Sequence, residues 1–148
     1  MQNLKFLNKK EAERIINKIK YQFGINKLDF NYGMLQNKEG KIFIISKDVN
    51  KIDLSKLRIN ELGLYIAKID KELRLTIEGS QLFGKSATKN VYGINEEEAD
   101  SWMQGNEISC SKEFNGFVII KYKNNYIGSG KWKDYKIINF IPKERRIK

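Results

Sequence analysis

The chain has 148 residues, enough to bury a core as one ordinary domain or two small ones. Its 28 Lys and Arg against 18 Asp and Glu give a formal net charge of +10, which favours an anionic partner. Histidine is absent and Cys110 is the only cysteine, so Ser–His or Cys–His catalysis, a His-ligated zinc site and an internal disulfide are excluded.

The sequence lacks the signals of a membrane or secreted protein. No apolar run reaches membrane-spanning length, and the N-terminal stretch MQNLKFLNKKEAERI has no apolar signal segment. A single cysteine also agrees with a reducing compartment. We therefore expect a soluble, cytoplasmic protein without a membrane partner.

The positive charge is concentrated at the two ends. Residues 1–27 and residues 131–148 each hold seven basic and two acidic side chains, whereas residues 61–130 are net acidic. If the two ends meet in the fold, they form one anion-binding face. The alternative is that these lysines only cover a solvated surface.

The first predicted element is an amphipathic helix between Asn8 and Gly24. Asn8 fits an N-cap, and Glu11 fits its reciprocal partner in a capping box. Apolar residues then recur at spacings of three and four as far as Phe23, and Gly24 stands where a left-handed C-cap belongs.

Two strands are predicted to follow this helix. A short one lies around residues 34–35, and a buried one covers residues 41–46 (KIFIIS), which are rich in β-branched and aromatic side chains. Residues 47–56 are polar and are predicted as a loop with one helical turn. Residues 1–60 are thus predicted to be a small α/β domain.

From residue 61 onward the pattern favours short strands with few long connections. Residues 61–69 and 73–77 alternate around a turn as a hairpin, and residues 78–87 fit a short helix with phosphate-compatible side chains. Five or six such strands favour a closed or half-closed barrel over residues 61–148.

A second helix is predicted to begin at Asn95 and to end at Gly105. Three glutamates, Glu96 to Glu98, occupy its first turn, where the helix dipole favours anions. They could instead be a metal or acid–base site, but the electrostatics of a helix start explains them more simply. Trp102 is predicted to be a core anchor rather than a base-stacking residue.

The last third contains a predicted β-hairpin with two glycines. Residues 117–122 and 126–130 flank the pair Asn124-Asn125, which tolerates a tight turn. Gly128 and Gly130 fall on one face, where the missing side chains let a backbone or a ligand come close. A third strand covers residues 137–141.

Cations alternate with aromatic rings after the second of these glycines. Lys131, Lys133 and Lys136 are interleaved with Trp132 and Tyr135, a pattern that suits a polyanion with unpaired bases. The alternative is that the glycines relieve crowding in a small barrel, the rings are core and the lysines are solvated surface.

Six segments in one order carry a family resemblance: GLYIAKI, LTIEGSQLF, NEEEADSWMQG, NGFVIIKY, YIGSGK and KIINFIPKERR. The chain resembles the PUA-like module at the C-terminus of Nol/Nop/Sun-type RNA 5-methylcytosine methyltransferases. Its overall plan is also similar to archaeal and eukaryotic ribosome-biogenesis factors that pair a pre-PUA domain with a PUA domain. The resemblance covers residues 61–146 well and residues 1–60 only in general plan.

The resemblance implies an α+β fold with a small N-terminal α/β pre-PUA unit, residues 1–60, followed by a PUA-like mixed β pseudo-barrel, residues 61–148. It also implies binding of structured RNA, either rRNA or tRNA, in ribosome maturation or RNA modification. Residues 1–60 offer no Gly-rich S-adenosylmethionine loop, and one cysteine cannot form a catalytic pair. We therefore predict an RNA-binding protein that is not an enzyme, needs no cofactor or metal, and acts beside an RNA methyltransferase or ribosome-assembly protein.

The cationic tail and the glycine-bearing hairpin are predicted to lie side by side as one positive surface. The tail would bind phosphates, the glycines would let the RNA backbone approach, and the helix at residues 78–87 would add contacts. The predicted RNA-binding residues are Ser80, Lys85, Gly128, Gly130, Lys131, Lys133, Lys136, Lys143, Arg145, Arg146 and Lys148.

Two other functions stay open at this point. The chain could be a protein-interaction adaptor that docks on an RNA-modification enzyme or ribosome-assembly factor, with an exposed apolar patch on residues 1–60. An enzyme that works through carboxylates is the weaker alternative, because the sequence places no pair such as Glu78 and Glu98 in a common pocket.

Overall fold

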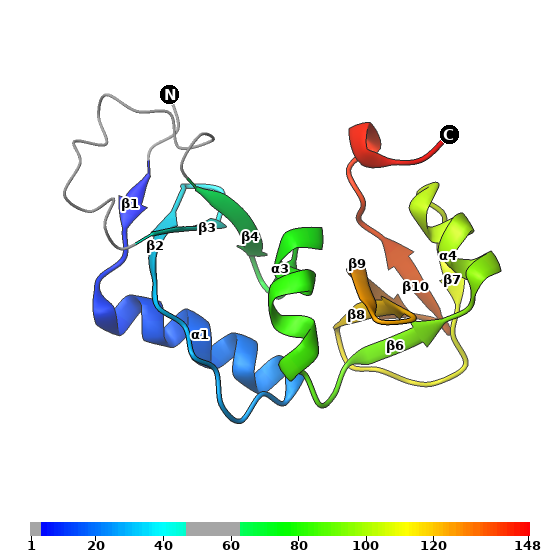
Figure 1. Cartoon of the computed structure of the whole chain (residues 1–148), viewed down its shortest axis with the longest axis horizontal. Coiled ribbons are helices and arrows are strands. Elements are labelled where there is room, and N and C mark those ends of the chain that lie inside the picture. The colour runs from blue at the N-terminus through cyan, green and yellow to red at the C-terminus, as the bar shows by residue number, and fades with distance from the viewer. Residues whose placement is uncertain (1–3, 47–62) are drawn as a thin grey trace.

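Two five-stranded sheets lie on either side of helix α3 (Ile77–Phe83) in the computed structural model, which describes residues 4–46 and 63–148 (Figure 1). The first sheet has the order β1-β2-β3-β4-β5, and the second has the order β6-β8-β9-β10-β7. The α+β class predicted from the sequence is confirmed, with a curled second sheet that fits a PUA-like pseudo-barrel.

Helix α1 (Lys9–Phe23) forms as predicted. The Asn8 side chain accepts a hydrogen bond from the Glu11 amide, and the Glu11 carboxylate accepts one from the Asn8 amide, so both halves of the capping box are present. Gly24 closes the helix at φ 63°, a conformation that favours glycine. Ile15, Ile19 and Phe23 are buried against the first sheet.

The first sheet is antiparallel throughout. Its strands are β1 (Lys5–Phe6), β2 (Tyr32–Gln36), β3 (Lys41–Ser46), β4 (Leu64–Ile69) and β5 (Leu73–Leu75). The predicted strands at 34–35 and 41–46 and the predicted hairpin around residues 70–72 are all present. The predicted loop at 47–56 lies outside the described residues.

The first sheet continues past residue 60, because β4 pairs with β3 and β5 pairs with β4. Their inward side chains join the core formed with α1. The division at residue 60 stays a prediction, and the sheet pairing favours a later boundary.

The second sheet consists of β6 (Val91–Ile94), β7 (Ile108–Ser109), β8 (Phe117–Tyr122), β9 (Asn125–Lys133) and β10 (Lys136–Asn139). Strand β6 was not predicted, since it has only four residues and pairs in parallel with the distant β8. Helix α4 (Glu96–Met103) starts with a second capping box, between Asn95 and Glu98. Its fully buried Trp102 anchors the core, as predicted.

The predicted hairpin between β8 and β9 is present, but its turn is formed by Lys123 and Asn124, with the positive φ of 53° at Lys123. Ile120 faces Gly128 and Lys121 faces Tyr126, so β9 has one extra residue, a β-bulge. Gly128 adopts φ 138° next to this bulge, a conformation that side chains disfavour.

Hydrogen bonds at the C-terminus of α1 join the two halves of the molecule: the first half contains α1 and the first sheet, and the second half contains α4 and the second sheet. Residues 88–90, here called the junction segment, run past that helix end between η3 (Gly84–Ser86) and β6. The amides of Thr88 and Lys89 donate to the Phe23 carbonyl at 2.8 and 3.1 Å, and the Asn90 side-chain amide donates to the Gln22 carbonyl at 2.6 Å. Carbonyls that a helix end leaves unpaired are therefore satisfied by the other half of the molecule.

Within the described residues, no helix has both the length and the apolar character needed to cross a membrane.

Candidate nucleic-acid interface

The predicted cations lie on strands β9 and β10 and on the C-terminal segment, which contains the short helix η4 (Lys143–Arg145). We call residues 143–148 the tail. Its backbone is fixed, because the Ile147 amide donates to the Met103 carbonyl at the end of α4 at 2.8 Å. Arg145 and Gly128 line one small cavity of about 60 Å³, so the tail does lie beside the hairpin.

Three of the predicted cations are paired with carboxylates. Lys131 lies 2.7 Å from Glu72, Lys136 lies 3.4 Å from Glu107, and Arg145 lies 2.7 Å from Glu78. These glutamates are distant from their partners in the sequence. The surface formed by β9, β10 and the tail is therefore less positive than the sequence alone predicts. Each pair is partly exposed, and such pairs are weak enough in water for a polyanion to compete with them.

The Arg145 guanidinium holds Glu78 with two contacts, from Nη1 to Oε1 at 2.8 Å and from Nη2 to Oε2 at 2.7 Å. This bidentate geometry lowers the pKa of the Glu78 carboxyl below its ordinary value, mainly through the hydrogen bond from Arg145 and against the opposing effect of burial. The same pair raises the pKa of Arg145, so both groups stay charged.

Five predicted cations form no ion pair with any residue that the structure describes: Lys85, Lys133, Lys143, Arg146 and Lys148. The four lysines are exposed, and Arg146 is half-buried. Lys85 follows the C-terminal end of α3, whereas the tail contacts the N-terminal end of that helix through the Arg145–Glu78 ion pair. The structure therefore does not bring Lys85 to the tail. Arg146 donates from Nε to the Ile141 carbonyl at 3.0 Å and covers Gly105.

Three predicted contact residues are buried in the protein, which corrects their predicted role. Ser80 is 0% exposed and donates its hydroxyl to the Thr76 carbonyl. A Cβ on Gly130 would overlap the Ile138 carbonyl and the Trp102 ring, and Gly128 faces Ile77 and Trp102. The glycines therefore make room for the protein's own core, as the alternative interpretation held.

Sequence reasoning missed a row of cations on the first sheet. Lys41 on β3 lies directly opposite Lys68 on β4, and Lys68 lies directly opposite Arg74 on β5. We call these three residues the cation row. The Glu39 carboxylate lies 3.7 Å from the Lys41 ammonium and compensates part of this charge. Lys68 and Arg74 form no such ion pair with a residue in the described part of the chain, and like charges placed directly opposite each other destabilise a sheet, so a bound anion would stabilise this pair. Strand register, which sequence spacing alone does not give, is the only signal that reveals it.

The cation row leads to the tail. The Arg74 guanidinium lies over the Phe140 ring at 5.0 Å from its centroid, and Arg74 and Arg145 line the same small cavity. Phe140 follows β10 and is 37% exposed, so an aromatic ring stands among cations from both halves of the chain. Asp70, Glu72 and Glu78 line the same cavities as Phe140. The combination of ring and cations suits phosphates and unpaired bases.

A family model matches the second part of the chain. Residues 89–147 match the family described as Methyltransferase RsmF PUA domain. The predicted resemblance to a PUA module is confirmed. The matched residues contain the whole second sheet, α4 and all of the tail except Lys148. Strand β6 is the first strand of the matched segment.

Curated relatives extend the similarity beyond the PUA module. The ribosomal RNA small subunit methyltransferase F of Aeromonas salmonicida is 28% identical over 137 residues, which cover 91% of this chain and 28% of that protein. The proteins of the same name from Psychromonas ingrahamii and Vibrio parahaemolyticus are 28% and 26% identical over 83% and 93% of this chain. The chain spans less than a third of the length of these relatives.

The alignments cover most of the first sheet as well as the PUA module, so the likeness to methyltransferases is broader than the sequence motifs indicated. The relatives named here are bacterial. The resemblance to archaeal and eukaryotic ribosome-biogenesis factors, and a role in ribosome biogenesis, therefore stay predictions.

Proposed function

We propose that this chain binds structured RNA during the modification or maturation of ribosomal RNA, and that it does so without catalysing a reaction itself. The observation that carries this proposal is the convergence of the cation row with the tail at Phe140. The match to an RsmF PUA domain and the likeness to ribosomal RNA methyltransferases support the choice of RNA over other polyanions.

A folded RNA suits this surface because its charges are regularly spaced along a rigid backbone. A-form RNA hides its major groove from side chains and is recognised mostly through phosphates, 2′-hydroxyls and shape. Lys68 and Arg74, held in register on neighbouring strands, offer two cations at a fixed spacing for adjacent phosphates. Lys143 and Lys148 would extend the contact along the tail.

The methyl transfer that the names of the relatives describe would be supplied by a catalytic part outside the segment that this chain aligns with. We assign to this chain the task of holding the RNA for such a methyltransferase, whether in the same protein or in a partner, in the cytoplasm. A role as a protein-interaction adaptor stays the alternative.

The test is a pair of neutral substitutions in the cation row, Lys68→Gln/Arg74→Gln. The probe is a fluorescently labelled stem-loop fragment of small-subunit ribosomal RNA, and its affinity is measured by fluorescence anisotropy over a series of salt concentrations. The double variant should bind at least about tenfold more weakly, and the slope of log affinity against log salt should shrink by about 1.4–1.8 for two lost phosphate contacts.

Lys9→Gln/Lys10→Gln is the matched control, because it removes the same charge from the first turn of α1, on the opposite side of the molecule from the tail (Figure 1). An equal loss of affinity in the control would show that net charge alone drives binding. Reversing Arg145 and Arg146 is a poorer test, since Arg145 also holds Glu78 and Arg146 also caps the Ile141 carbonyl.

A further inference from the structure

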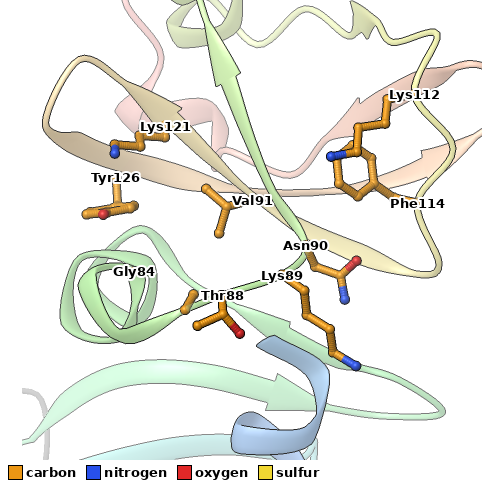
Figure 2. A pocket seen from close by; sticks show the side chains of 10 residues that line it. Gly84, Thr88, Lys89, Asn90, Val91, Lys112, Phe114, Lys121 and Tyr126 are labelled. Carbon is orange, nitrogen blue, oxygen red and sulfur yellow. The ribbon is translucent and has the colours of Figure 1, made fainter. Parts of the chain in front are cut away.

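A second basic site lies where the two halves of the chain meet. It is an open cavity of about 350 Å³ bordered by η3, the junction segment, the loop before β8 and the turn end of the β8–β9 hairpin. Figure 2 shows Tyr126 and Lys121 on one side of Val91, with Phe114 and Lys112 on the other. We call this cavity the junction cleft.

The junction cleft is a positively charged cavity. Lys89, Lys112 and Lys121 line the cavity, and its lining contains no carboxylate. None of these three lysines forms an ion pair with a residue in the described part of the chain. The cleft is therefore a site of uncompensated positive charge separate from the tail.

Each lysine of the junction cleft lies over an aromatic ring. The Lys121 ammonium is 5.5 Å from the Tyr126 ring centroid, the Lys112 ammonium is 5.1 Å from that of Phe114, and the Lys89 ammonium is 4.9 Å from that of Tyr21 on α1. Such cation–π contacts are weak at exposed sites. A base can therefore displace an ammonium from a ring, and the ammonium can then meet the phosphate of the same nucleotide.

The position of Tyr126 is fixed by two features of the backbone. The bulge in β9 places Tyr126 directly opposite Lys121, and bulges commonly re-aim a side chain in this way. On its other side the ring lies against Gly84, where a Cβ would overlap it. Gly84 has an ordinary helical φ of −57°, so close approach of the ring is what requires glycine here.

The floor of the junction cleft is held by the hydrogen bonds that tie the junction segment to α1. Asn90 adopts φ 57°, and its carbonyl accepts from the Ile119 amide at 2.8 Å. The cleft is therefore preformed, which lowers the entropic cost of binding.

From this arrangement we infer that the junction cleft binds an unpaired nucleotide of the RNA, while the cation row and the tail hold the folded part. This inference rests on the proposed function. The cavity has the size of a small-ligand pocket, whereas a duplex is far too wide to enter it. Aromatic rings among cations are how proteins hold unpaired bases and their phosphates.

The experiment compares two probes on the full chain, a labelled oligouridine single strand and a labelled blunt-ended RNA duplex of the stem alone, which has no unpaired nucleotide. Lys112→Gln/Lys121→Gln should weaken binding of oligouridine at least about tenfold and binding of the duplex less than about twofold. Lys68→Gln/Arg74→Gln should instead weaken binding of the duplex more than binding of oligouridine. Lys9→Gln/Lys10→Gln should leave both affinities close to those of the unaltered chain.

The outcomes separate this inference from the proposed function. If the duplex binds but the cleft variant keeps its affinity for oligouridine, or loses affinity for both probes equally, only the junction cleft is overturned. If the unaltered chain binds neither probe, the proposed function fails together with the inference.

A charge-neutral variant gives a second readout. Tyr126→Leu keeps an apolar side chain against the first core but removes the ring, and it should weaken oligouridine binding by about five- to a hundredfold at a temperature where circular dichroism shows the variant to be folded. Ultraviolet cross-linking to oligo-4-thiouridine should label peptides that contain Phe114 or Tyr126. Labelling confined to the tail would contradict the assignment.

Discussion

At the scale of single residues, the glycines of the second sheet act as spacers for the core. Gly130 lies under the Trp102 ring and beside the Ile138 carbonyl, whereas Gly93 on β6 has open space where a Cβ would stand. Gly93 also has no positive φ. Substitution of Gly130 by alanine therefore tests core packing, and the same substitution at Gly93 is a control for the lost backbone freedom.

We expect Gly130→Ala to lower the free energy of unfolding by about 1–3 kcal/mol, because the added methyl group overpacks the core. Gly93→Ala should change it by less than about 0.5 kcal/mol. Urea denaturation followed by tryptophan fluorescence measures both values. A Gly130→Ala protein that keeps its stability but loses RNA affinity would restore the original interpretation of this glycine as a ligand contact.

At the scale of elements, helix α3 holds the two sheets together. Its N-cap Thr76 accepts from the Gly79 amide at 3.0 Å and donates to the Tyr65 carbonyl at 2.8 Å, which fixes the helix to β4. At one end Ile77 packs against the core of the second sheet, and at the other end Phe83 is buried in the core of the first. Glu78 in its first turn also holds the tail through Arg145.

The Glu78–Arg145 pair predicts a dependence of stability on pH. Because the pKa of Glu78 is lowered in the folded state, the pair contributes its full stability above the ordinary carboxyl pKa of 4.5 and loses it as the pH falls through the lower folded-state value. Both side chains are partly exposed, so this contribution should stay below about 1 kcal/mol.

The measurement is urea denaturation at neutral pH and at about pH 3, which lies below the unfolded-state pKa. Arg145→Gln should be less stable than the unaltered chain at neutral pH, and the difference should narrow in acid. Lys133→Gln, which removes an exposed and unpaired cation from β9, is the control. A difference that does not depend on pH would mean that the pair contributes through packing alone.

At the scale of the whole molecule, the two halves share many polar contacts. Beyond those of the junction segment, Gln22 on α1 donates to the Phe117 carbonyl at 3.0 Å, and Ser129 on β9 donates to the Leu75 carbonyl at 2.6 Å. Ile119 on the second sheet is part of the core of the first. We therefore expect the chain to unfold as one cooperative unit.

Both tryptophans, Trp102 and Trp132, lie in the second half, whereas α1 lies in the first. Urea denaturation followed by fluorescence and by far-ultraviolet circular dichroism should thus give coincident transitions. Asn90→Ala should lower the unfolding free energy by about 2–3 kcal/mol, because it loses a hydrogen bond and places alanine at φ 57°. Asn90→Gly, which tolerates that φ, should lose less. Separate transitions in the unaltered chain would contradict this coupling.

The sequence predicted correctly the features that depend on residues close to one another along the chain. The cap of α1, the strand at Lys41–Ser46 and the start of α4 all follow from side chains within a few positions of each other. It did not predict what depends on distant pairing: the parallel partner of β6, the membership of β4 and β5 in the first sheet, and the carboxylates beside the tail. The predicted binding surface accordingly contained the cations of the tail but lacked the cation row, which meets the tail at Phe140.

The way the junction segment caps α1 has a consequence for engineering this fold. A fusion that borrows residues 89–147 alone would lose the Thr88 amide donor and would leave Lys89 and Asn90 without the Phe23 and Gln22 acceptors. It would also expose the side of Ile119 that the first core covers. A transplant that starts upstream of α1 avoids both defects, so the portable unit is longer than the recognisable motif.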